Sequence, residues 1–132
     1  MAYTRALNAP TQFGDPLVLS VVGTASTAAT DLPVKVPWNN VDLVYAYWVL
    51  TTIIDTGDCA FKIEDSGTTV ATATITESEC AVGDVGDFSM TAGVHGNRIN
   101  LLNTDTMNIE IDGASGNGQF TIYMYFEPSA YA

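Results

Sequence analysis

Segment 118–127 alternates between apolar and polar side chains, and this period of two constrains the fold more than any other feature of the sequence. One side carries Phe120, Ile122, Met124 and Phe126, and the other carries Gln119, Thr121, Tyr123 and Tyr125. Successive side chains of a β-strand lie on opposite faces, so the segment is predicted to be a strand with one buried face. No window of the sequence carries apolar residues at helical spacing over three turns.

Similar patterns predict about eight short strands, at 17–22, 32–36, 43–54, 59–64, 68–75, 98–102, 107–112 and 118–127. The 17 threonines suit this interpretation, because β-branched side chains pack well on a pleated surface. Turn signals every eight to twelve residues favour an all-β fold, an antiparallel β-sandwich. A jelly roll fits the number of strands best. An immunoglobulin-like topology is the alternative, weakened by the absence of a Cys–Trp–Cys arrangement.

We divide the chain into an extended N-terminal arm, residues 1–15, and a single β-sandwich domain, residues 16–132. The arm shows no alternation and is bracketed by Pro10 and Pro16. Fully extended, fifteen residues reach about 50 Å, far enough to lie across a neighbouring subunit. Segment 80–96 contains four glycines and is predicted to be a long loop.

The segment 43–54 differs from the others because both of its faces are apolar. Leu43, Tyr45, Tyr47 and Val49 are expected on one side, and Val44, Ala46, Trp48 and Leu50 on the other. This composition is typical of a central strand that is covered on both sides. In a two-layer domain the outer cover is supplied either by side chains of loops or by a second chain.

Charge and cysteine content restrict the classes of partner and the compartment. The net charge of -11 disfavours nucleic acid and anionic membranes as partners, because both attract basic surfaces. The N-terminus carries no apolar run of signal-peptide length, so we expect synthesis in a cytoplasm. Cys59 and Cys80 are then expected to be reduced, buried thiols, although they could pair if their strands are neighbours.

No group of residues forms a convincing catalytic or metal site, so we expect no enzyme activity and no cofactor. The tripeptide Asp55-Thr56-Gly57 matches the signature of aspartic proteases, which leaves a homodimeric protease centred on Asp55 as a remote alternative. Asp58 follows it where that family has Ala or Ser, and Asp-Thr-Gly is also an ordinary turn. A catalytic dyad of His95 with Cys59 or Cys80 has little support, because a lone histidine is more often an ordinary loop residue. The acidic loops suit a solvated surface better than a calcium site.

The chain as a whole resembles the small jelly-roll head decoration (cement) proteins of tailed bacteriophages. The resemblance rests on the arm, the Thr/Gly/Ala-rich β body, the sparse lysine, the acidity and the aromatic strand at 121–126. It implies a structural protein of the virion that forms homotrimers on the capsid exterior. Its partners would be the major capsid protein, whose adjacent subunits it clamps, and further copies of itself.

The residues of these contacts follow from our own analysis, since the resemblance includes no specific motif. We expect the arm to bind the capsid through Tyr3, Arg5, Leu7 and Phe13. We expect the decoration subunits to pack against each other through Tyr45, Tyr47, Tyr123 and Tyr125. A carbohydrate-binding or host-adhesion module is the alternative function, with Trp38 as its sugar-stacking residue.

Overall fold

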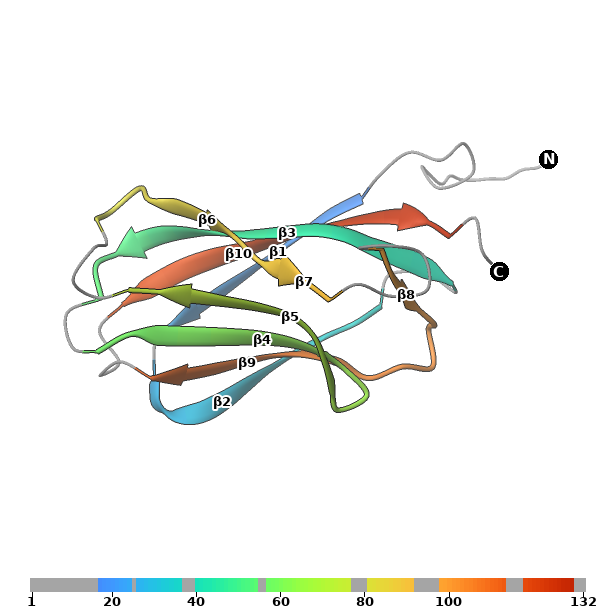
Figure 1. Cartoon of the computed structure of the whole chain (residues 1–132), viewed down its shortest axis with the longest axis horizontal. Helices are drawn as coiled ribbons and strands as arrows, with labels where there is room; N and C mark the ends of the chain where they lie inside the picture. Colours follow the sequence, from blue (N-terminus) through green and yellow to red (C-terminus); the bar gives the residue numbers. More distant parts are fainter. Residues whose placement is uncertain are drawn as a thin grey trace.

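The computed structural model describes residues 17–24, 26–36, 40–54, 57–76, 81–91, 98–113 and 118–129, which form ten β-strands in two layers (Figure 1). The strands are β1 (Leu17–Thr24), β2 (Ser26–Val34), β3 (Val41–Thr52), β4 (Cys59–Asp65), β5 (Thr68–Ile75), β6 (Val85–Asp87), β7 (Ser89–Met90), β8 (Ile99–Leu101), β9 (Met107–Gly113) and β10 (Gln119–Pro128). These ranges contain no helix that is long and apolar enough to cross a membrane.

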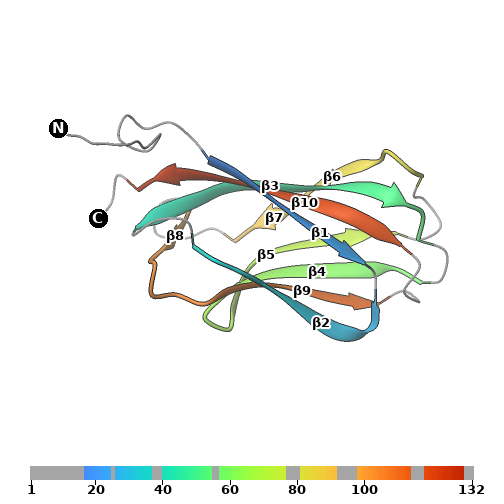
Figure 2. The same ribbon diagram turned by 180° about the vertical axis from the view of Figure 1, so that it is seen from behind.

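The strands form two antiparallel sheets that face each other, as the two opposite views show (Figure 2). The first sheet has the order β1-β10-β3-β6, with β8 also paired to β3, and the second has the order β2-β9-β4-β5-β7. Strands from the two halves of the chain pair in a nested manner, β1 with β10, β2 with β9 and β3 with β8, around the β4–β5 hairpin. This nesting is that of a jelly roll, which confirms the predicted fold class.

The number of strands exceeds the predicted eight because segment 80–96 is not simply a loop. It contributes β6, which pairs with Tyr47–Val49, and β7, which pairs with Ala71 and Thr72 of the other sheet. Strands β6 and β8 run in the same direction along one side of β3, and together they form the interrupted edge of the first sheet. The first half of β2 was also missed, since β2 begins at Ser26 rather than at residue 32.

The core lies between the two sheets and is made by the inward side chains of the alternating strands. The burial of β10 alternates as the sequence predicts, with Phe120, Ile122, Met124 and Phe126 fully buried. Phe61 of β4 meets Phe120 edge to face at 4.6 Å between ring centroids, which joins the two sheets at the centre of the core.

A β-bulge in β3 corrects the predicted assignment of its faces. Tyr45 pairs with Tyr125, but the next residue of β10, Phe126, pairs with Leu43, so Val44 is the extra residue. The bulge turns Leu43 into the core, where it is fully buried, instead of leaving it on the side of Tyr45 and Tyr47. The expectation for Leu43 was therefore wrong, because a strict period of two does not survive an inserted residue.

Candidate assembly interface

The outer surface of the first sheet carries tyrosines and valines in three cross-strand rows, and we call it the aromatic face. The register aligns Val18, Tyr125 and Tyr45 in the first row, Ser20, Tyr123, Tyr47 and Asp87 in the second, and Val22, Thr121, Val49 and Val85 in the third. All are exposed or partly exposed, as expected for the positions that alternate with the core residues. The structure thus brings together the four tyrosines predicted to form a subunit interface.

The tyrosine rings contact one another. Tyr47 stacks on Tyr123 with 5.0 Å between ring centroids and 19° between planes, and Tyr45 lies 5.4 Å from Tyr47. The hydroxyl of Tyr45 donates a hydrogen bond of 2.5 Å to Oδ1 of Asp87. This bond, with some burial and the charge of Asp87, raises the pKa of Tyr45 above its ordinary value of 10.0. Asp87, which is the one charged residue in the three rows, therefore has a hydrogen-bond partner within the face.

The valines at the two sides of the aromatic face are strongly exposed. Val22 is 72% exposed, Val85 59% and Val18 49%, and the two strands that carry them, β1 and β6, are the outer strands of the sheet. Isolated exposed valines are common, but here they continue a surface whose centre is already aromatic. The result is a contiguous, weakly charged face across the four strands.

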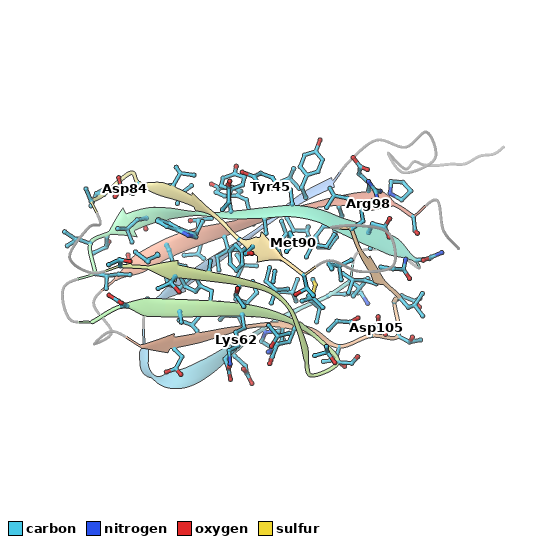
Figure 3. The ribbon with its side chains drawn as sticks, in the orientation of Figure 1. Tyr45, Lys62, Asp84, Met90, Arg98 and Asp105 are labelled. Atoms are coloured by element: carbon cyan, nitrogen blue, oxygen red, sulfur yellow. The ribbon has the colours of Figure 1, made fainter. Side chains whose placement is uncertain are left out.

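The outer surface of the second sheet has the opposite character. Its cross-strand rows carry Asp31, Glu110, Lys62, Thr72, Asn108, Glu64 and Asp112. Lys62 and Glu110 form an exposed ion pair at 3.7 Å, and Asn108 donates a hydrogen bond of 2.8 Å to Glu64. Tyr45 and Lys62 lie on opposite sides of the sandwich (Figure 3). One outer surface is thus suited to water, whereas the other resembles the core of a protein interface, where charge is depleted and tyrosine enriched.

A polar cluster that the sequence analysis missed lies beside the aromatic face, where β3 begins and β10 ends. Asp42 is fully buried and accepts hydrogen bonds from Arg98 Nε at 2.9 Å and Asn100 Nδ2 at 3.1 Å. Arg98 also forms an ion pair with Glu127 at 2.9 Å. The cluster holds β8, which follows Arg98, against β3 and β10. A charged residue in an otherwise apolar strand was the signal for it.

The pKa values of this ion pair are displaced in the directions that keep both groups charged. Burial alone would raise the pKa of Asp42, but hydrogen bonds from Asn100, Arg98 and Ser129 and the charge of Arg98 outweigh it, so the pKa lies below 3.8. Burial likewise opposes the charge of Arg98, but its bonds to Asp42 and Glu127 raise its pKa.

A pair of carboxylates is formed by Asp65, at the end of β4, and Asp105, in the segment between β8 and β9. Burial raises the pKa of Asp65 to about 6, helped by the charge of Asp105 and a hydrogen bond to it. Oδ1 of Asp65 is buried and has no hydrogen-bond partner among the described residues. In the described ranges no group of three or more His, Cys, Asp or Glu side chains is placed to hold a metal ion.

Several predicted residues lie outside the residues that the structure describes. They are Tyr3, Arg5, Leu7 and Phe13 of the arm, Trp38 of the alternative sugar site, Asp55 of the protease alternative, and Cys80 and His95. The predictions made for them stay predictions. Cys59 is described, and it is a buried free thiol whose pKa is raised to about 12, chiefly by burial.

Neither a protein-family model nor a curated protein sequence matches this chain. Among solved structures, a protein of Bacillus endospore appendages, described as disulfide-linked pili, is similar over 96% of this chain and 100% of its own, with 15% identity and a TM-score of 0.48. An insecticidal delta-endotoxin of Bacillus thuringiensis follows over 86% and 19%, with 14% identity and a TM-score of 0.38. A protein of infectious bursal disease virus is similar over 87% and 42%, with 10% identity and a TM-score of 0.27. All three TM-scores lie below 0.5, so these similarities are not evidence of a shared function.

Proposed function

We propose that this protein is a structural component of a virion, a decoration protein that binds the capsid exterior and clamps adjacent subunits of the major capsid protein. The observation that carries the proposal is the difference between the two outer surfaces of the sandwich. One is charged and suited to solvent, whereas the aromatic face is apolar at its centre and at both edges.

Burial of the aromatic face is favourable for physical reasons. Tyrosine provides a large contact area with few rotatable bonds, and its hydroxyl keeps a polar partner, as Tyr45 does with Asp87. Apart from Asp87, the neighbours of the tyrosines on this face are valine, threonine and serine, which lose less hydration on burial than lysine or glutamate would. Such a face binds by area and shape, so a clamp built on it needs no catalytic group.

In this proposal the aromatic face packs decoration subunits against each other, and the arm with Tyr3, Arg5, Leu7 and Phe13 contacts the capsid. The resemblance to phage decoration proteins implies three copies in each assembly. Three copies together carry a net charge of 3 × -11, or -33. At physiological salt the Debye length is about 8 Å, so most of the resulting repulsion is screened.

The test measures binding to purified capsids assembled from the major capsid protein encoded in the same genome. We expect the full chain to co-sediment with these capsids, and deletion of residues 2–13 to abolish binding while the circular dichroism spectrum stays unchanged. Tyr123→Lys should weaken self-association measured by light scattering, whereas Thr72→Lys on the outer surface of the second sheet should not. Full-length protein that fails to bind, or a truncated chain that binds equally well, contradicts the proposal for the capsid contact.

A further inference from the structure

Within the part of the chain that the structure describes, strand β1 forms an edge of the first sheet without the features that usually protect an edge. It has eight residues, none of them charged and none of them proline, and it pairs with β10 residue by residue without a bulge. Among the described residues β10 is its only partner. Since backbone N–H and C=O groups on the free side of such a strand are available for pairing, an unprotected edge of this length is a site for another strand.

Most of the other edge strands of the sandwich carry such protection. Strand β2, at the edge of the second sheet, carries Asp31 and Pro33, and proline is confined to edges where no ladder bond is needed. On the opposite sides lie β6, β7 and β8, which have only two or three residues each, and β7 covers only Ala71 and Thr72 of the eight residues of β5. Short edge strands and strands with charge or proline are the devices by which natural sheets avoid intermolecular pairing.

The sequence of β1 is complementary to itself in an antiparallel arrangement centred on Ser20. In that register Val18 lies opposite Val22 of the second copy, and Ser20 lies opposite Ser20. On the inner side Leu19 lies opposite Val21. From Val18 to Val22, every cross-strand pair is then apolar with apolar or hydroxyl with hydroxyl, both of which stabilise sheets. No pair brings like charges together.

The surroundings of β1 also fit a second copy of this acidic chain. A groove of about 380 Å³ runs between β1 and β2, and its lining residues are Leu19, Ser20, Val21, Pro33, Val34 and Lys35. This lining contains no carboxylate and one cation, although the chain carries a net charge of -11. Charge repulsion between the groove linings of two copies is therefore small.

We propose that β1 pairs with β1 of a second copy across a two-fold axis, with Ser20 opposite Ser20, so that two first sheets join into one continuous sheet. The pairing places Val18 of one copy beside Val22 of the other and makes their aromatic faces continuous. It is a contact separate from subunit packing over the tyrosines, and it does not require capsid binding.

Cysteine cross-linking tests the contact and its register in the full-length protein with Cys80→Ser as background. Opposed residues of antiparallel strands have Cα atoms about 4.5 or 5.5 Å apart, within the range that a disulfide bridges. Under mild oxidation we expect Ser20→Cys to give a covalent dimer on a non-reducing gel. Val18→Cys alone should remain uncrosslinked, but it should link when mixed with Val22→Cys. The control Thr72→Cys, exposed on the other sheet, should remain uncrosslinked.

A charged substitution at the centre of the contact provides the second test. Ser20→Lys places two ammonium groups opposite each other at an exposed position, so the fold should be kept while the dissociation constant of the dimer rises at least about tenfold in sedimentation velocity. Val85→Lys, at the other side of the same face, should leave this dimer unchanged. Absence of the Ser20→Cys dimer, or efficient self-linking of Val18→Cys, overturns the pairing. Loss of capsid binding alone contradicts the proposed function and leaves the pairing supported.

Discussion

Replacing Arg98 with methionine tests the polar cluster that fastens β8 to the first sheet. Asp42 has no exposed surface, and the guanidinium of Arg98 is its one ionic partner among the described residues. Methionine keeps much of the aliphatic bulk of arginine but removes both the charge and the Nε donor. The carboxylate of Asp42 is then left buried with Asn100 as its main remaining donor, and Glu127 loses its ion pair.

The expected loss of stability follows from the burial of the two partners. Removing one member of a buried ion pair costs 3–5 kcal/mol in general, and because the Arg98 side chain is 32% exposed we expect the lower end, about 3 kcal/mol. Lys62→Met is the matched control. It breaks the Lys62–Glu110 pair, whose lysine is 51% exposed, and it should cost less than about 1 kcal/mol.

Urea unfolding followed by tryptophan fluorescence in a Trp38→Phe background, where the signal comes from Trp48 buried in the same sheet, measures both values. The pKa of Asp42 lies below 3.8 in the folded protein, so the pair stabilises above that pH and its contribution is lost as the pH falls through the folded-state pKa. The difference between wild type and Arg98→Met should therefore shrink in acid. An Arg98→Met variant that loses no more stability than Lys62→Met would refute the reasoning.

Three further predictions concern other sites. Gly86→Ala should destabilise by about 1–3 kcal/mol, because its Cβ would lie 2.3 Å from Cζ2 of Trp48, and Trp48→Phe in the same chain should recover part of the loss in urea titrations. The folded-state pKa of Asp65, about 6, exceeds its ordinary 3.8, so stability should fall as the pH rises from about 4 to about 6. Asp65→Asn should remove this part of the pH dependence, and equal thermal shifts in both proteins would contradict the assignment. In a Cys80→Ser background the Cys59 thiol, with a pKa of about 12, should react with maleimide only after unfolding, so fast labelling in native buffer would show that it is accessible.

The long strands could be predicted from the sequence because each is defined by its own residues. The alternation in β10 specifies which four side chains enter the core, and the structure confirms all four. The same pattern in β3 placed Tyr45 and Tyr47 on the outer surface. It failed at Leu43, because the bulge there is decided by pairing with β10, which lies far away in the sequence.

Features that depend on distant partners could not be predicted. Strand β6 has three residues, and Gly86 within it leaves space for the indole of Trp48, which local sequence does not reveal. Asp42 and Arg98 are 56 residues apart and meet only through the pairing of β3 with β8. The unprotected edge of β1 emerged only with the order of strands in the sheet, since the same eight residues at the centre of a sheet would be ordinary.

The nested order of the strands has a consequence for how the chain folds during synthesis. The first strand, β1, hydrogen-bonds to the last, β10, and β10 separates β1 from β3 within the sheet. The first sheet therefore cannot be completed until β10 has left the ribosome. Because such distant pairings make folding slow, β1 stays without its partner in the nascent chain until then. Chaperone supply and translation rate should consequently influence the yield of folded protein.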